Sequence, residues 1–84
     1  MTRDEIFDTT RRTMARTFDV DPAVISERTT AEDVSGWDSV SHLVLLTGLE
    51  KRFNVALPTD KVHAAQDVGA LIDIIERTLA EHAR

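Results

Sequence analysis

The sequence predicts an all-α protein: a four-helix bundle with three long helices, one short helix and a long loop between helices one and two. Three observations lead to this class. Apolar side chains recur at helical spacing in three separate segments, no segment alternates in the manner of a strand, and 42% of the 84 residues are apolar. A chain of this size has enough apolar surface for one modest core, so residues 1–84 are expected to form a single domain.

The first helix is expected from about Arg3 to Thr17. Thr2 and Glu5 have the spacing of a capping box, in which two side chains satisfy free N–H groups at a helix start. Side chains for one helix face then recur about one turn apart: Ile6, Phe7, Thr10, Met14 and Phe18.

The long loop spans residues 19–36, DVDPAVISERTTAEDVSG. Pro22 restricts its neighbours, and the polar composition favours irregular backbone with short turns. The apolar side chains expected to anchor this loop to the core are Val20, Val24, Ile25 and Val34. Loops longer than the usual helix connection are commonly functional.

The second helix, from Ser39 to Phe53, has the strongest helical pattern. Asp38 or Ser39 suits its N-cap. Asn54 and Pro58 suit its end, because Asn tolerates left-handed backbone and Pro cannot extend a preceding helix. The inward face of this helix is expected to contain Leu43, Leu46, Leu49 and Phe53.

A short third helix is expected in TDKVHA, residues 59–64, and a last helix from Asp67 to about His82. The last helix has a narrow apolar stripe that consists of Val68, Leu71, Ile72, Ile75 and Leu79. The side chains expected to meet inside the bundle are Leu46, Leu49, Phe53, Leu71 and Ile75.

Composition argues against several classes of function. A net charge of −5 and a pI of about 5.0 favour a basic protein partner over nucleic acid. Without cysteine there is neither a disulfide nor a thiolate metal site, and the histidines lack metal-ligand spacing. The charged start MTRDEIFD and the short apolar runs predict neither a signal peptide nor a membrane span. We therefore expect a complete, free-standing, monomeric protein of the cytoplasm, with no bound metal and no membrane partner.

The stretch GWDSVSHLVLLTGLEKRF, residues 36–53, contains the motif Asp38, Ser39, Val40 at the start of the second helix. Together with LEKRFNVALP after it and DVGALIDII at the start of the last helix, this motif resembles the acyl carrier protein family over the whole chain. The resemblance implies a carrier and not an enzyme, with no catalytic residue. It also implies that Ser39 is the attachment point for 4'-phosphopantetheine, which a separate phosphopantetheinyl transferase takes from coenzyme A.

The position of Ser39 suits that chemistry. At a helix N-terminus, unpaired backbone N–H groups and the helix dipole favour the new phosphodiester anion, by about 0.3 to 1 kcal/mol at an exposed site. Asp38 is expected to cap the helix and to form part of the element that the transferase recognises. Gly36 should adopt backbone that bulkier residues resist, and Trp37 should pack across the loop onto the bundle.

Plainer roles exist for the same residues. Ser39 could merely cap the helix in an unmodified helical adaptor. His42, three residues later, could form a Ser–His dyad of hydrolytic type, although no orienting acid or oxyanion hole is evident. We favour His42 as a partly exposed residue near the arm. The other histidines and serines that we expect in surface or turn positions are His63, His82, Ser26, Ser35 and Ser41.

The outer face of the second helix indicates the kind of carrier. Fatty-acid carriers resemble one another in an acidic ridge there, whereas this chain retains only Asp38 and Glu50. Val40, Val44 and Thr47 instead form a stripe of small side chains that we expect to dock partner enzymes. These partners would be an acyl- or aminoacyl-loading enzyme, a ketosynthase or other enzymes of polyketide or mixed polyketide–peptide biosynthesis. The alternative is a stand-alone aminoacyl carrier of peptidyl or D-alanyl type.

Overall fold

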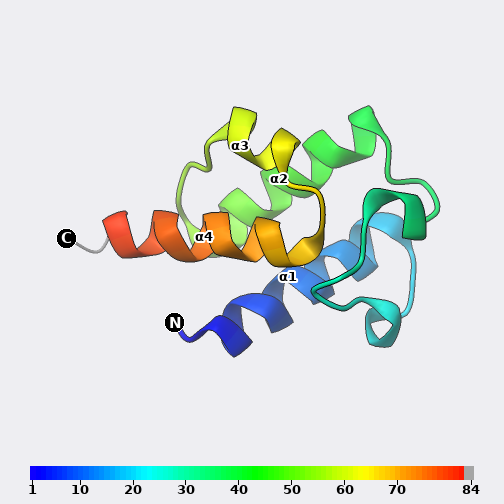
Figure 1. Cartoon of the computed structure of the whole chain (residues 1–84), viewed down its shortest axis with the longest axis horizontal. Coiled ribbons are helices and arrows are strands. Elements are labelled where there is room, and N and C mark those ends of the chain that lie inside the picture. Colours follow the sequence, from blue (N-terminus) through cyan, green and yellow to red (C-terminus); the bar gives the residue numbers. More distant parts are fainter. Residues whose placement is uncertain (83–84) are drawn as a thin grey trace.

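A computed structural model describes residues 1–82, which fold into four α-helices (Figure 1). Their bounds are α1 Arg3–Phe18, α2 Ser39–Phe53, α3 Thr59–Ala64 and α4 Val68–His82. Two single 3-10 turns, η1 Pro22–Val24 and η2 Ala31–Asp33, interrupt the long loop between α1 and α2. The helices, the short turns and the absence of strands within residues 1–82 confirm the predicted fold class.

The start of α1 is the predicted capping box. The Glu5 backbone N–H donates to Thr2 Oγ1 at 3.2 Å, and the Thr2 N–H donates to Glu5 Oε1 at 2.8 Å. These reciprocal bonds satisfy N–H groups that have no partner inside the helix. The helix ends at Phe18, and its C-cap is Asp19, whose φ of 55° is left-handed. The side chains that α1 buries are Ile6, Thr10, Thr13, Met14 and Ala15.

Two of the four expected loop anchors, Ile25 and Val34, are buried, and Val20 packs against the core while partly exposed. The fourth, Val24, was wrongly assigned because its side chain is 66% exposed. Ile25 has extended backbone directly after η1, with φ −95° and ψ 125°. Adjacent residues in such backbone point to opposite sides, so Val24 and Ile25 do not both reach the core.

The part of the long loop between η1 and η2 is hydrogen-bonded to the start of α4. The Val68 N–H donates to the Thr29 carbonyl at 2.9 Å, and the Gly69 N–H donates to the Glu27 carbonyl at 2.7 Å. These carbonyls supply partners for N–H groups at the helix start. The loop therefore has a fixed path beside the bundle, which Figure 1 shows passing the first turn of α4.

The buried face of α2 consists of Leu45, Leu46, Leu49 and Phe53. The periodicity assigned Leu43 to this face, but the Leu43 side chain is 51% exposed. Leu45, which is 1% exposed, is buried instead. Apolar residues occupy a broad arc of this helix, so spacing alone does not decide which edge of the arc turns inward. Contact with α1 decides it.

α1 packs against both α2 and α4, and α3 packs against α4. The contact between α1 and α2 is close at Gly48, where an added Cβ would lie 3.2 Å from Thr13 Cγ2. All five side chains expected to meet inside the bundle belong to the single core, as do Ile6, Met14 and Ile72 from α1 and α4. Within the described residues, no helix is long and apolar enough to cross a membrane.

Candidate functional site

Asp38 organises the start of α2. Its Oδ1 accepts hydrogen bonds from the backbone N–H groups of Val40 and Ser41, each at 3.0 Å. Its backbone carbonyl accepts from the His42 N–H at 2.8 Å. The chain enters this cap through Gly36, whose φ of 87° strains any residue with a Cβ. Asp38 is thus the N-cap that the sequence predicted.

Ser41 completes the cap, a role that the sequence analysis missed. The Asp38 N–H donates to Ser41 Oγ at 2.8 Å, and this hydroxyl donates to the Gly36 carbonyl at 2.6 Å. The arrangement is a capping box with serine in the third helical position. The three-residue spacing from Asp38 was the available signal, but capping boxes usually have Glu or Gln there. Ser41 is therefore partly exposed, as expected, and also has a structural role in the cap.

Ser39, by contrast, is exposed as the first residue of α2, and its hydroxyl takes no part in this cap. Of the four N–H groups at the helix start, those of Asp38, Val40 and Ser41 are bonded, so only the Ser39 N–H stays outside the cap. The expectation that unpaired backbone N–H groups favour an anion on Ser39 is therefore too broad, because three of the four already have partners. The helix dipole remains, and the Ser39 hydroxyl is accessible to another protein.

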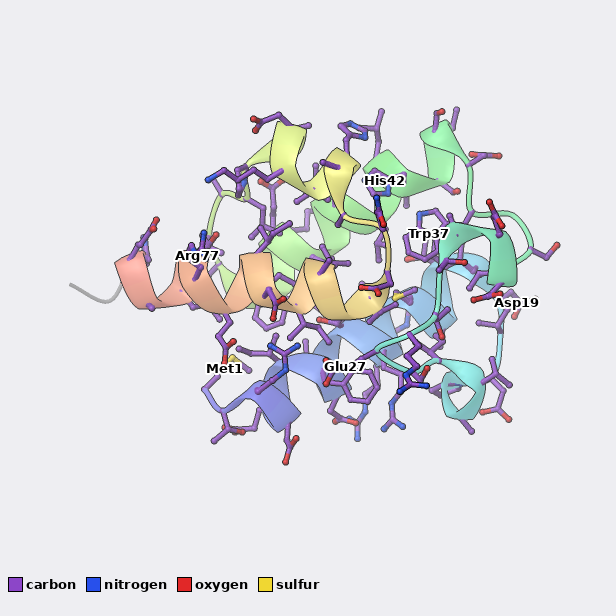
Figure 2. The ribbon with its side chains drawn as sticks, in the orientation of Figure 1. Met1, Asp19, Glu27, Trp37, His42 and Arg77 are labelled. Carbon is purple, nitrogen blue, oxygen red and sulfur yellow. The ribbon has the colours of Figure 1, made fainter. Side chains whose placement is uncertain are left out.

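An aromatic cluster lies beside Ser39. The Trp37 ring packs on Phe18 with ring centroids 5.3 Å apart, which confirms the expected packing across the loop. Trp37 Nε1 donates a hydrogen bond to His42 Nδ1 at 3.1 Å, and the His42 and His63 rings are 4.8 Å apart. Figure 2 shows Trp37 and His42 next to each other at the end of the molecule where α2 begins.

The Trp37 bond fixes the proton of His42. Because Nδ1 accepts from Trp37, the neutral ring has its proton on Nε2. Two causes lower the pKa of His42 below its ordinary value: the larger is burial of the ring, and the smaller is the neighbouring His63. The neutral form is therefore favoured. Neither ring nitrogen is then free to accept the Ser39 hydroxyl proton. The geometry does not support a Ser–His dyad.

A recess of about 270 Å³ opens between the start of α2 and α3. Ser39 and His42 line it from α2, and His63 lines it from α3. Trp37, Ala65 and Gln66 contribute from the adjoining loops. Ser39, the serine of the motif, thus adjoins a space that can receive part of a group attached to its hydroxyl.

The outer face of α2 is apolar. Val40, Leu43 and Val44 are 73%, 51% and 58% exposed, and Thr47 is also exposed. A shallow hollow is lined by Leu43, Val44, Thr47, Gly48 and Lys51. Leu43 joins this surface, which the sequence had limited to the other three residues. We call Val40, Leu43, Val44 and Thr47 the α2 outer stripe.

The two acidic residues that remain near the α2 outer stripe are both engaged in structure. Glu50 Oε2 accepts from the Leu57 N–H at 2.9 Å and so holds the loop after α2. The Asp38 carboxylate accepts from N–H groups of its own helix. The first helical residues of α2 contain no acidic side chain. A partner that approaches the α2 outer stripe therefore meets mainly apolar side chains, with the exposed Asp38 carboxylate at the start of the helix.

Comparison with known proteins identifies the family of the chain. Residues 8–75 match the family described as "Phosphopantetheine attachment site". An acyl carrier protein of Phenylobacterium zucineum (strain HLK1) is 25% identical over 75 residues, which are 89% of this chain and 95% of the relative. An acyl carrier protein of Caulobacter vibrioides is 26% identical over 76 residues, covering 90% of this chain and 97% of the relative.

The fold has a similar counterpart among solved structures. The solution structure of a holo acyl carrier protein from Geobacter metallireducens superimposes with a TM-score of 0.81 at 28% identity. The match covers 92% of this chain and 88% of the other. The chain belongs to the acyl carrier protein family.

Membership settles the class of activity. The protein is a carrier and not an enzyme, and its cofactor is covalently attached 4'-phosphopantetheine. It interacts with a phosphopantetheinyl transferase and with acyl-handling enzymes. The site fits this group, because an exposed hydroxyl at a helix start adjoins a recess that is also lined by His42, whose ring Nε2 has no hydrogen-bond partner within the described residues. Within residues 1–82, no group of His, Cys, Asp or Glu side chains is arranged to hold a metal ion.

Proposed function

We propose that Ser39 is the attachment point for 4'-phosphopantetheine and that residues 1–84 form one carrier domain. The exposure of the Ser39 hydroxyl at the first residue of α2 carries this proposal. The neighbouring Ser41 hydroxyl is bonded to the Gly36 carbonyl and to the cap, so it is less available. The attached group supplies the thiol that the cysteine-free chain lacks, and acyl intermediates are held on it as thioesters.

The residues at the start of α2 have separate tasks in loading. Ser39 Oγ attacks the coenzyme A phosphorus that bears the pantetheine, a P–O bond of the diphosphate bridge breaks to release adenosine 3',5'-bisphosphate, and the serine proton passes to a base on the transferase. Asp38 fixes the helix start and offers the transferase a rigid element, because its carboxylate is held by two backbone N–H groups. These same bonds keep Asp38 ionised: hydrogen bonds from Ser41 hold the pKa of Asp38 below its ordinary value.

The pathway is proposed from the surface of α2. The exposed, apolar α2 outer stripe and the engagement of Asp38 and Glu50 favour partners that read shape rather than charge. Polyketide or mixed polyketide–peptide biosynthesis is the pathway class that we propose, with a dedicated loading enzyme and a ketosynthase as partners. A carrier of primary fatty-acid synthesis would be expected to present free acidic side chains on this helix.

The attachment site is tested by intact mass. Incubation with coenzyme A and a broad-specificity phosphopantetheinyl transferase should add one phosphopantetheine to the wild-type protein and none to Ser39→Ala. Ser35→Ala is the matched control, because Ser35 is an exposed serine just before the motif and lies outside the capping box. Addition to Ser39→Ala, or no addition to a folded wild-type protein, would overturn the assignment.

A further inference from the structure

One hydrogen-bond donor beside Ser39 has no partner. His42 Nε2 is buried and forms no hydrogen bond within the described chain. Because Nδ1 accepts from Trp37, Nε2 carries the proton and is a donor. A buried donor without an acceptor is unfavourable, and such a group in a native structure calls for an explanation.

The place of His42 limits what its partner can be. On a helix, residues three apart are neighbours, so the His42 ring lies about one turn from Ser39. Both residues line the same recess of about 270 Å³. The first acceptor atoms that any group on Ser39 brings to this place are the oxygens of its phosphate. More distant parts of the arm would have to fold back to reach the ring.

The cap explains why a donor is needed there. Asp38 already occupies the N–H groups of Val40 and Ser41, which would otherwise face an anion at the helix start. The ionised Asp38 carboxylate also adds negative charge close to Ser39. His63 is the titratable residue of α3 that faces His42. A histidine side chain is never an anion near neutral pH, so His63 is not an anionic acceptor for His42. The Nε2–H of the His42 ring is thus a donor beside Ser39 that the cap does not use, in addition to the Ser39 backbone N–H.

We propose that His42 is a positioning residue that donates from Nε2 to an anionic oxygen of the phosphodiester on Ser39 and directs the base of the arm into the recess. This inference rests on Ser39 as the attachment site. The neutral ring then forms two bonds at once, accepting from Trp37 at Nδ1 and donating from Nε2. The contact involves the arm alone, so it is the same for every cargo.

The first test compares the apo protein with the holo protein whose thiol is free, after peptide mapping has placed the arm on Ser39. Imidazole resonances are followed by NMR as a function of pH. Conversion to the holo form should raise the pKa of His42 by about 1 unit or more, the size expected for an anion hydrogen-bonded to the ring at about 3 Å in largely aqueous surroundings. His82, at the far end of α4, should not change. No change at His42 in confirmed holo protein would overturn the inference while the attachment site stands.

The second test observes the phosphorus. A phosphodiester does not itself titrate near neutral pH, so any pH dependence of its 31P shift reports a neighbouring group. We expect the 31P shift to follow the His42 titration in wild type and in His63→Ala. In His42→Phe, which keeps an aromatic ring without the donor, the 31P shift should no longer depend on pH. A 31P titration that survives His42→Phe, or that is lost in His63→Ala alone, would contradict the proposal. So would a His42 shift that appears only after the thiol is acylated, because the cargo would then be the partner. Wild-type NMR data decide the question if His42→Phe does not fold.

Discussion

Asp38, Ser39 and Ser41 stand within one helical turn, and each has a different task. Asp38 and Ser41 hold the backbone of the helix start, and their side chains bind main-chain groups of residues 36–41. Ser39 stands between them with its hydroxyl outside the cap. The nucleophile is thus presented on a rigid frame that does not depend on it. Replacement of Ser39 should remove the attachment site and leave the helix start intact.

The Asp38 cap predicts how stability depends on pH. Hydrogen bonds from Ser41 hold the folded-state pKa of Asp38 below its ordinary value, so the unfolded chain binds a proton more readily than the folded one. This contribution to stability is present above pH about 4, the ordinary range of an Asp carboxyl, and is lost as the pH falls through the folded-state value. Glu5 in the α1 capping box, held by the Thr2 backbone and hydroxyl, has a lowered pKa and behaves in the same way.

Urea unfolding midpoints measured between pH 3 and pH 6 test this prediction. Below pH about 4, the urea midpoint of the wild-type protein should decrease with falling pH more steeply than the midpoint of Asp38→Asn, in which position 38 no longer titrates. Glu5→Gln serves as the parallel variant for the other capping box. Identical pH profiles for wild type and Asp38→Asn would show that the Asp38 bonds contribute nothing to folding in solution.

At the scale of elements, α2 has two apolar sides with different surroundings. One side is buried in the core, and the other is the α2 outer stripe. Leucines on the two sides therefore provide a matched pair of substitutions in one helix. Leu49 is fully buried, whereas Leu43 is 51% exposed.

Leu49→Ala should destabilise the protein by about 2 to 5 kcal/mol, because it removes buried methyl groups and leaves a cavity. In so small a domain this loss could unfold it. Leu43→Ala should change the stability by about 0.5 kcal/mol or less, as surface substitutions usually do. Thermal or urea unfolding followed by circular dichroism measures both. Equal effects of the two substitutions would mean that α2 is rotated relative to the arrangement described above.

The α2 outer stripe predicts a second pair of variants. Val44→Glu places a charge in the centre of the stripe and should lower acylation of the holo protein by its own loading enzyme about tenfold, with the helical circular dichroism unchanged. Recognition by fatty-acid enzymes with basic docking patches should improve. Ala80→Glu adds the same charge to an exposed position of α4 and is the control. Wild-type acylation kinetics for Val44→Glu would remove the stripe from the docking surface.

At the scale of the whole molecule, Arg3 joins three segments that are far apart in the sequence. Its guanidinium lies 2.6 Å from Glu27 of the long loop, and 2.6 Å and 3.1 Å from Asp73 and Glu76 of α4. Hydrogen bonds to Glu27 and Asp73 raise the pKa of Arg3, which remains charged at all relevant pH values. A basic residue at the start of a helix opposes the helix dipole, so only this tertiary network explains its position.

Arg3→Ala should therefore destabilise the protein by about 1 kcal/mol, because partly exposed ion pairs contribute modestly and three carboxylates would be left close together. The loss should shrink in 1 M NaCl, where exposed charges are screened within about 3 Å. Arg12→Ala is the matched control, since within residues 1–82 Arg12 pairs only with Asp8 of its own helix. Urea unfolding at low and high salt measures both variants. A loss that does not respond to salt would indicate packing of the Arg3 stem rather than its charge.

The sequence by itself determined the helix boundaries to within about a residue, the caps apart from the contribution of Ser41, and the position of the modification motif. These features depend on residues a few positions apart: Thr2 with Glu5, Asp38 at the start of α2, and Asn54 with its left-handed φ at the end. Hydrogen bonds of this kind form within one turn of the chain, so the local order of residues specifies them. The core members of α2 and α4 followed from the same local periodicity, apart from the edge of the α2 face.

Only the tertiary structure decided which edge of α2 is buried, which loop valine reaches the core and what His42 touches. Burial of apolar groups has no direction of its own, so a helix such as α2, apolar over a broad arc, can turn either edge inward until its neighbours are placed. Contact with α1 buries Leu45 and exposes Leu43. The bond from Trp37 to His42 likewise depends on where the loop brings Trp37, and that bond leaves the free donor beside Ser39.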